Sequence, residues 1–263
     1  MMQSVLDHFG LTAPPTPNLT FARELLTAYT QNVPWGSTCR ISRKSLSTPA
    51  ERARFAHAFW ADVIERGGDG TCFESNYAFF ALLQSLGYAG YLTLNNMGDS
   101  VQCHSAIVLL MDDEKWLVDV GLPVLALIRL DPHHVTIGES VWHEYIAIPK
   151  GNGFSYDIMQ SHHPSPYCFT LMDAPIEDEH YRQRLIHDHT PEAGLFLDKV
   201  IMRKVIDGSV VRYNGRDEDR IVEEFPPRAK KRQYEIEGDV AAGLSETFGV
   251  DVDVVQAALD ASE

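Results

Sequence analysis

The hydrophobic pattern of the chain changes its period near residue 88, and this change limits the fold more than any other feature of the sequence. Before it, apolar residues recur at helical spacing over 18–35 and over 50–68. After it, turn signals such as "MDDEK" and "KGNG" separate short apolar runs that predict strands at 88–94, 103–111, 115–122, 125–130, 143–149 and 166–172. Helices followed by strands predict an α+β protein.

The last part of the chain mixes both patterns. A hairpin is predicted about Asp207-Gly208, and residues 244–261 predict a capped helix or a helix pair. The strands before them suggest a barrel or a sandwich-like sheet. We therefore expect three parts: helices at 1–88, a barrel or sandwich-like sheet at 89–190 and a mixed α/β part at 191–263.

The net charge of −15 excludes a general binder of nucleic acid or anionic membrane, because polyanions are repelled by such a surface. An anionic small ligand would need a local basic or backbone-amide site. Four scattered cysteines without a CxxC pair argue against a disulfide framework and a cysteine-rich zinc site. No signal-peptide pattern and no run of about 18 apolar residues occurs, so we expect a cytoplasmic protein with reduced thiols.

One cysteine lies where a helix should begin. In "GGDGTCFESNYAFFALLQSLGY" (67–88), Thr71 and Glu74 fit a capping box, which makes Cys72 the first helical residue. Unpaired amides and the positive end of the helix dipole favour a thiolate there. The alternative is an ordinary buried cysteine, since free cysteine is among the most buried residue types.

Two polar residues on neighbouring strands are candidate partners for the thiol. A two-residue turn at 112–113 would place Asp119 opposite Ala106, on the same face as His104 and about 7 Å away from it diagonally. A four-residue turn also keeps both on one face, whereas a three-residue turn without a bulge separates them. His104 could instead be a half-buried strand histidine, and Asp119 could cap a turn. An aspartate between two valines of an apolar strand is nevertheless costly without a partner.

Five stretches of the chain resemble the arylamine N-acetyltransferase family. "RGGDGTCFESN" (66–76) is similar to its R-G-G-x-C-x-E-x-N motif, "CHSAIVLL" (103–110) to its histidine strand and "VDVGLP" (118–123) to its "DVGFG" strand. "NVPW" (32–35) is similar to "IPFEN", and "ETFGVDVD" (246–253) to the segment containing "FGI". The resemblance thus touches all three parts of the chain.

The resemblance implies a helical bundle, a β-barrel and an α/β lid around a cysteine-protease-like triad of Cys72, His104 and Asp119. It implies a ping-pong reaction in which acetyl-CoA, or another acyl-CoA, acylates Cys72 and an amine or hydroxylamine then takes the acyl group. It also places Trp35 and Leu122 beside the acceptor pocket as substrate-binding residues.

The chain departs from the family pattern at three places. Two extra residues separate Gly68 from Cys72, Gly36 stands where the family has a glutamate, and Leu122-Pro123 replaces an aromatic residue and a glycine. The triad chemistry is unaffected by these changes. The acceptor, the acyl chain and the oligomeric state stay open.

Other candidate sites are weaker. His133-His134, His162-His163 and "HDH" (187–189) lack the HExxH pattern, so no metal is expected. Basic "RAKKR" (228–232) could attract CoA phosphates or serve as a localisation signal, although a charge run is usually a solvated face.

The leading hypothesis for the function of the chain is an acyltransferase. The alternatives are a thiol hydrolase or amide synthase with the same triad, and a non-catalytic ligand-binding relative.

Overall fold

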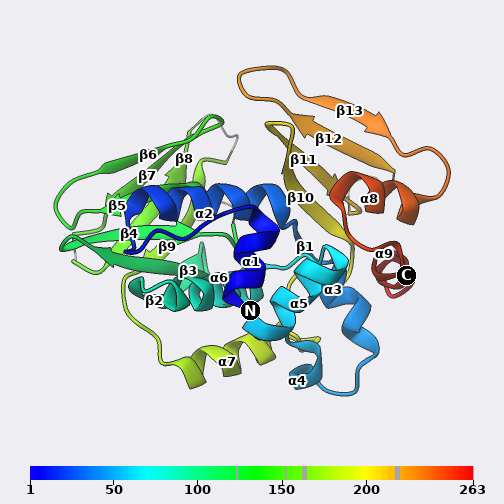
Figure 1. Cartoon of the computed structure of the whole chain (residues 1–263), viewed down its shortest axis with the longest axis horizontal. Helices are drawn as coiled ribbons and strands as arrows, with labels where there is room; N and C mark the ends of the chain where they lie inside the picture. The colour runs from blue at the N-terminus through cyan, green and yellow to red at the C-terminus, as the bar shows by residue number, and fades with distance from the viewer. Residues whose placement is uncertain (123, 152, 162–164, 217–219, 263) are drawn as a thin grey trace.

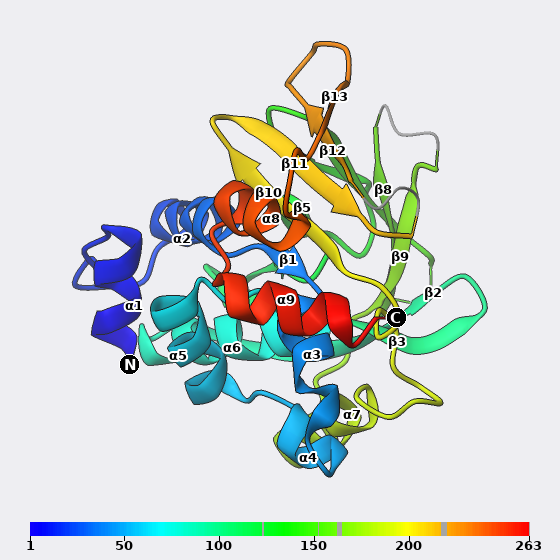
Figure 2. The ribbon, with the colours of Figure 1, turned by 90° about the vertical axis from the view of Figure 1, so that its right-hand side faces the viewer.

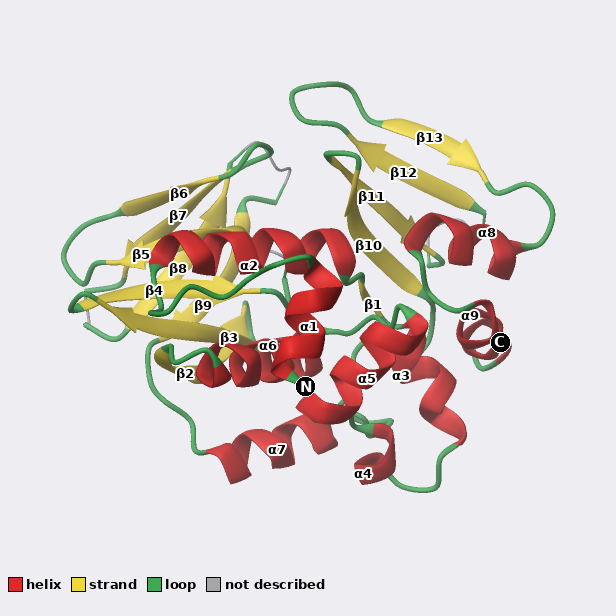
Figure 3. Cartoon of the chain, in the orientation of Figure 1, coloured by secondary structure: helices red, strands yellow, loops and turns green. Residues whose placement is uncertain are grey.

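The structure is a computed structural model that describes residues 1–122, 124–151, 153–161, 165–216 and 220–262. Helices dominate up to Ser85, as the sequence predicts (Figure 3). The predicted helix at 18–35 begins after Asn18, whose side chain accepts a hydrogen bond of 2.9 Å from the Phe21 amide. These elements are α1 (Met2–Phe9), α2 (Leu19–Asn32), the short strand β1 (Trp35–Gly36), α3 (Thr38–Ser42), the 3₁₀ turn η1 (Arg43–Ser45), α4 (Pro49–Arg52), α5 (Ala56–Arg66) and α6 (Cys72–Ser85).

Strands follow from Ala89 and form, within the described residues, an eight-stranded sheet ordered β5-β4-β3-β2-β9-β8-β7-β6. Its end strands β5 and β6 lie side by side, so the sheet is a nearly closed barrel (Figure 1). Side chains of β3 alternate, with Ala106 and Val108 inside the barrel and Ile107 and Leu109 packed on the helices. The strands are β2 (Ala89–Met97), β3 (Ser100–Met111), β4 (Glu114–Asp119), β5 (Val124–Leu130), β6 (Thr136–Glu139), β7 (Glu144–Pro149), β8 (Ser155–Gln160) and β9 (Tyr167–Met172).

The C-terminal part contains a second sheet, which is five-stranded in the described residues and ordered β1-β10-β11-β12-β13. The hairpin predicted about Asp207-Gly208 is confirmed, since Ile206 pairs with Ser209 and both turn residues have positive φ. The helix pair predicted at 244–261 is also present. The elements are β10 (Ile201–Ile206), β11 (Ser209–Asn214), β12 (Ile221–Phe225), β13 (Arg232–Glu235), α8 (Val240–Phe248) and α9 (Val252–Asp260).

The first and last parts of the chain are joined closely. Strand β1 pairs with β10, and α3 packs on α9, where Cys39 and Ile41 enter the C-terminal hydrophobic cluster (Figure 2). Helix α7 (Asp178–His187) follows the barrel and returns to α6, where Tyr181 packs on Phe73. The division at 88/89 and 190/191 stays a prediction. Of the helices in the described ranges, none has the length and apolar character that crossing a lipid bilayer requires.

Candidate active site

Cys72 is a partly exposed free thiol and the first residue of α6, as the sequence predicts. The predicted capping box is wrong, because both of its side chains bind buried guanidinium groups instead. Thr71 Oγ1 accepts a hydrogen bond of 2.5 Å from Arg40 Nη1, and Glu74 Oε2 lies 2.6 Å from Arg54 Nη2. Charge-assisted hydrogen bonds are stronger than the neutral ones that a cap would make.

His104 and Asp119 meet through the turn that the sequence suggested. Asp112 and Asp113 form a two-residue turn with φ of 52° and 61°, and Met111 pairs with Glu114. The predicted register is therefore confirmed. It brings His104 Nε2 within 2.6 Å of Asp119 Oδ2, and the two side chains are only 2% and 0% exposed.

The protonation of His104 follows from this contact. Burial alone would lower the pKa of His104. The charge of Asp119 and hydrogen bonds to Asp119 and Cys72 outweigh burial and raise this pKa to about 10. The ring is therefore a cation at neutral pH. Its Nε2 donates to Asp119, which leaves Nδ1 for Cys72.

The second oxygen of Asp119 is held by three donors. Oδ1 accepts hydrogen bonds from Asn76 Nδ2 at 3.0 Å, the Gly121 amide at 2.7 Å and the Leu122 amide at 3.0 Å. Asn76 also accepts from the Val120 amide at 3.1 Å. These bonds fix the orientation of the carboxylate. Sequence reasoning gave Asn76 no role, although it lies one helical turn after Cys72 and hence on the same face of α6.

Ser105 and Tyr181 hold the backbone at the start of α6. Ser105 Oγ donates to the Cys72 carbonyl at 3.0 Å, and the single hydroxyl proton of Tyr181 lies between two acceptors, Ser105 Oγ at 2.8 Å and the Phe73 carbonyl at 2.9 Å from Oη. Tyr181 comes from α7, and nothing in its local sequence singles it out.

The turn after β4 lies directly against Cys72. A Cβ on Gly121 would lie 2.4 Å from Cys72 Cα and 2.5 Å from Asn76 Nδ2. Only glycine therefore lets this turn approach the start of α6 closely enough for Asp119 to reach both His104 and Asn76.

The extra residues before Cys72 explain why position 36 is a glycine and not a glutamate. Asp69 is fully buried, and its carboxylate accepts hydrogen bonds of 2.8 Å each from the Thr38 and Cys39 amides. A Cβ on Gly36 would lie 2.3 Å from Asp69 Oδ2. The longer loop thus brings a carboxylate into space that any side chain at position 36 would need.

This coupling predicts a double-mutant result. Gly36→Ala should lower the free energy of unfolding by about 1–3 kcal/mol, because the new methyl group overpacks against Asp69 and the Ile201 carbonyl. Adding Asp69→Ala removes one of these clashes, so the double variant should be less destabilised than the sum of both single variants. Urea denaturation of the four proteins measures this. If the loss of the double variant equals the sum of the two single losses, the side chains at positions 36 and 69 do not compete for the same space.

Two buried arginines surround this loop, and neither is the one that the motif suggested. Arg66 is 45% exposed and lies 3.6 Å from Asp251. Arg54 instead binds Glu74 and donates to the Asp69 carbonyl at 2.6 Å. Arg40 reaches Asp188 Oδ2 at 2.7 Å. Asp188 lies in the "HDH" segment, which therefore contributes an ion pair beside the loop that precedes Cys72.

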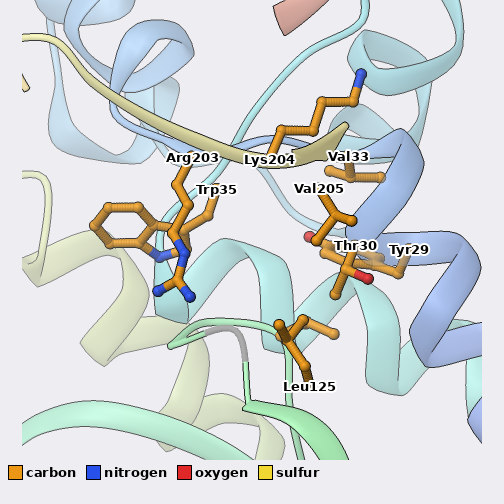
Figure 4. A pocket seen from close by; sticks show the side chains of 9 residues that line it. Tyr29, Thr30, Val33, Trp35, Leu125, Arg203, Lys204 and Val205 are labelled. Atoms are coloured by element: carbon orange, nitrogen blue, oxygen red, sulfur yellow. The ribbon is translucent and has the colours of Figure 1, made fainter. Parts of the chain in front are cut away.

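The two predicted substrate-binding residues, Trp35 and Leu122, lie in different surroundings. Trp35 is bridged to Gly70 and packs edge-on against Phe196 with ring centroids 5.3 Å apart. With Val120, Leu125 and Arg203 it lines a cavity of about 10 Å³, which is room for about one water molecule (Figure 4). The Leu122 side chain packs on the interior cluster of the barrel. Pro123 lies outside the described residues.

Of the three histidine segments considered as metal ligands, two lie within the described residues. Across the described ranges, no group of three or more histidine, cysteine, aspartate or glutamate side chains is arranged to hold a metal ion. His133 and His134 lie with Asp131 in an exposed turn. His162 and His163 lie outside the described residues.

Comparisons with known proteins agree with this geometry. The sequence profile described as N-acetyltransferase matches residues 20–257. No curated protein matches in sequence. Among solved structures, the arylamine N-acetyltransferase from Mycobacterium abscessus is 19% identical with a TM-score of 0.81, over 100% of this chain and 94% of that one.

Two further structures are similar. The Mycobacterium marinum arylamine N-acetyltransferase in complex with CoA is 17% identical with a TM-score of 0.81, over 100% of this chain and 98% of that one. The Bacillus cereus enzyme, described with a unique Cys-His-Glu catalytic triad, is 14% identical with a TM-score of 0.77, over 95% and 98%. At these identities the structures show a shared fold. Because the family profile spans most of the chain, the protein belongs to the arylamine N-acetyltransferase family of enzymes, as a divergent member.

Proposed function

We propose that the protein moves an acetyl or other acyl group from acyl-CoA to an arylamine, arylhydroxylamine or related amine through a thioester on Cys72. The observation that carries this proposal is the buried His104–Asp119 pair at 2.6 Å, set against a free thiol at the start of a helix. The family supports the reaction class, and the CoA complex of the M. marinum enzyme supports the donor.

In the first half of the reaction, the Cys72 thiolate attacks the thioester carbonyl. A new C–S bond forms, and the C–S bond to CoA breaks. His104 gives its Nδ1 proton to the departing CoA thiolate and becomes neutral, while Asp119 holds Nε2–H.

In the second half, the amine attacks the acyl-cysteine. Neutral His104 takes the proton that the amine loses, and Cys72 leaves as a thiolate beside the restored imidazolium. No proton is gained or lost by the site over one cycle. Each step needs only the three residues that we assign as catalytic. We propose that Trp35 and Leu122 border the acceptor.

The test is acylation of the protein by acetyl-CoA without an amine. We expect one acetyl group on Cys72 by intact-mass and peptide analysis, none in Cys72→Ala, and full labelling in Cys103→Ala. Cys103 is a suitable control because it is also a partly exposed free thiol, and its Sγ contacts the Ser100 carbonyl. Addition of an arylamine should then remove the label.

Other outcomes separate the remaining readings. Free acid released without an amine points to a thiol hydrolase, and a cyclised product points to an amide synthase. If no acyl-CoA of any chain length labels Cys72, the transferase proposal fails.

We also propose that the reaction takes place in the cytoplasm. We propose further that the chain divides into three parts at 88/89 and 190/191.

A further inference from the structure

Ser105 joins β3 to the start of α6 at the residue next to His104. Its side chain is fully buried. Side chains of a strand alternate, so Ser105 faces the helices, while His104 faces the barrel interior, where its ring lies 4.6 Å from that of Phe169. Ser105 Oγ donates to the Cys72 carbonyl at 3.0 Å, and Asn76 Nδ2 donates to the Ser105 carbonyl at 2.7 Å. Both the hydroxyl and the carbonyl of Ser105 therefore bind the beginning of α6.

These bonds close a short ring through Cys72 and His104. The two side chains are hydrogen-bonded to each other. His104 is joined to Ser105 by one peptide bond, so their Cα atoms are about 3.8 Å apart. Ser105 in turn is hydrogen-bonded to the backbone of Cys72. The bond from Ser105 thus restrains the distance between Cys72 Sγ and the imidazole ring.

Tyr181 of α7 restrains the Ser105 hydroxyl. The tyrosine side chain is fully buried, and its ring stacks on that of Tyr77 with centroids 5.4 Å apart. Its Oη lies 2.8 Å from Ser105 Oγ and 2.9 Å from the Phe73 carbonyl. A serine side chain has three staggered positions about its Cα–Cβ bond. The contact with Oη therefore holds the Ser105 hydroxyl in the position that reaches the Cys72 carbonyl.

Helix α7, at the lower edge of Figure 1, holds β3 on both sides of His104. Arg184 Nη2 donates to the Gln102 carbonyl at 2.8 Å, two residues before His104. Tyr181 contacts Ser105, one residue after it. Gln102 has a φ of 52°, a conformation that is unfavourable for residues other than glycine and persists where neighbouring contacts hold it. The helix thus fixes the short piece of β3 that presents His104.

We propose that Ser105 and Tyr181 are positioning residues, whose hydroxyl groups set the distance between Cys72 Sγ and His104 that acyl transfer requires. This inference rests on the proposed function. Both residues act through the backbone at the start of α6 and therefore need no contact with a substrate. A displacement of about 1 Å between reacting groups slows a reaction by about 100-fold. Loss of these hydroxyls should therefore lower the rate of the reaction and leave the binding of the donor unchanged.

The experiment compares Ser105→Ala and Tyr181→Phe with the control Tyr88→Phe. Tyr88 is also a buried tyrosine whose hydroxyl donates to a carbonyl at a helix start, that of Asn18 at 2.8 Å, but it follows the opposite end of α6. Single-turnover acetylation of Cys72 is measured over a range of acetyl-CoA concentrations. Alkylation of Cys72 by iodoacetamide gives a second rate that needs no acyl donor, and the melting temperature of each variant is recorded.

At saturating acetyl-CoA, Ser105→Ala should lower the acetylation rate about 10–100-fold and Tyr181→Phe about 3–10-fold, while the half-saturating concentration stays unchanged. Tyr88→Phe should keep the wild-type rate, although it loses a comparable hydrogen bond. Because Tyr181 acts through Ser105, Tyr181→Phe should slow the Ser105→Ala protein less than it slows the wild type. Alkylation rates should follow the same order, since the reactivity of a thiol also depends on its contact with histidine.

Wild-type rates in Ser105→Ala and Tyr181→Phe overturn the proposal. Equal slowing by Tyr88→Phe also overturns it, because the hydroxyls would then act on the fold alone, as does a raised half-saturating concentration with an unchanged maximal rate. If Ser105→Ala does not fold, the comparison of Tyr181→Phe with Tyr88→Phe decides. Failure of the transferase reading is distinct, because Cys72 of the wild type would then not be acetylated, while the order of the alkylation rates still tests the positioning.

Discussion

Asp119→Asn is expected to lower the rate of Cys72 acetylation by about 10³–10⁴-fold while the fold stays intact. Asparagine can keep its carbonyl oxygen on the Asn76, Gly121 and Leu122 donors, so its NH₂ group must face His104 Nε2. An amide donates there, and the neutral ring then carries its proton on Nδ1, toward Cys72. A ring in that tautomer cannot accept a proton from the thiol or the amine.

The matched control is Asp173→Asn. Asp173 is also a buried barrel carboxylate with a cation at 2.7 Å, in its case Lys115, but it does not contact the triad. We expect near-wild-type acetylation from it. Single-turnover mass spectrometry with acetyl-CoA measures both variants. An Asp119→Asn protein that keeps a tenth of the wild-type rate would exclude the tautomer-holding role.

The same variant should change the dependence of stability on pH. In the folded wild type the pKa of His104 is about 10, above the ordinary value of 6.5. Its contribution to the free energy of unfolding is therefore fully present below about pH 6.5 and is lost as pH rises through about 10. Asp119→Asn removes that contribution. The stability difference between wild type and variant, measured by urea denaturation, should narrow from pH 7 to pH 10.

The contact between His104 and Asp119 was predictable because a local feature decides it. A two-residue turn sets the register of both strands, and register decides which side chains share a face. The start of α6 was predictable for a similar reason, since glycines and a polar residue precede an apolar helical pattern. Both features lie within a few residues of the side chains that they place.

The distant contacts that hold the loop before Cys72 were not predictable in this way. The Arg40–Asp188 contact spans 148 residues, and β1 pairs with a strand that begins at Ile201. Local periodicity carries no information about such partners. The capping box failed for the same reason, because two distant arginines took both of its side chains. Strands β6 and β8 were missed because they are short and only partly apolar.

Glu74→Gln is expected to lower the free energy of unfolding by about 3–5 kcal/mol, because it leaves the Arg54 cation buried with too little compensation. Both side chains are almost fully buried and lie 2.6 Å apart. Arg54 also contacts the carboxylate of Asp62, which is 26% exposed and 3.2 Å away and so compensates less well. The Glu74 contact with His189 at 3.2 Å is weakened as well. For a chain of this size, each kcal/mol lowers the melting temperature by about 2–4 °C.

The free energy of unfolding at acid pH gives a second test of this prediction. Burial would raise the pKa of Glu74, but the charges of Arg54 and His189 and the hydrogen bonds from both together outweigh burial and hold this pKa well below its ordinary 4.5. The Glu74 contribution is therefore present above about pH 4.5 and is lost as pH falls through the lower, folded pKa. The difference in free energy of unfolding between wild type and Glu74→Gln should therefore become smaller in strong acid.

A surface pair supplies the control for Glu74→Gln. Glu114 contacts Arg129 at 2.9 Å with both side chains more than 40% exposed, so Glu114→Gln should leave the melting temperature unchanged. If both variants lose the same stability, burial of Arg54 is not the cause. If Glu74→Gln alone is destabilised and Glu74→Asp restores only part of the loss, the carboxylate must also lie at the right distance. The charge at position 74 then stabilises the loop that presents Cys72, because the Arg54 that it neutralises also holds the Asp69 carbonyl.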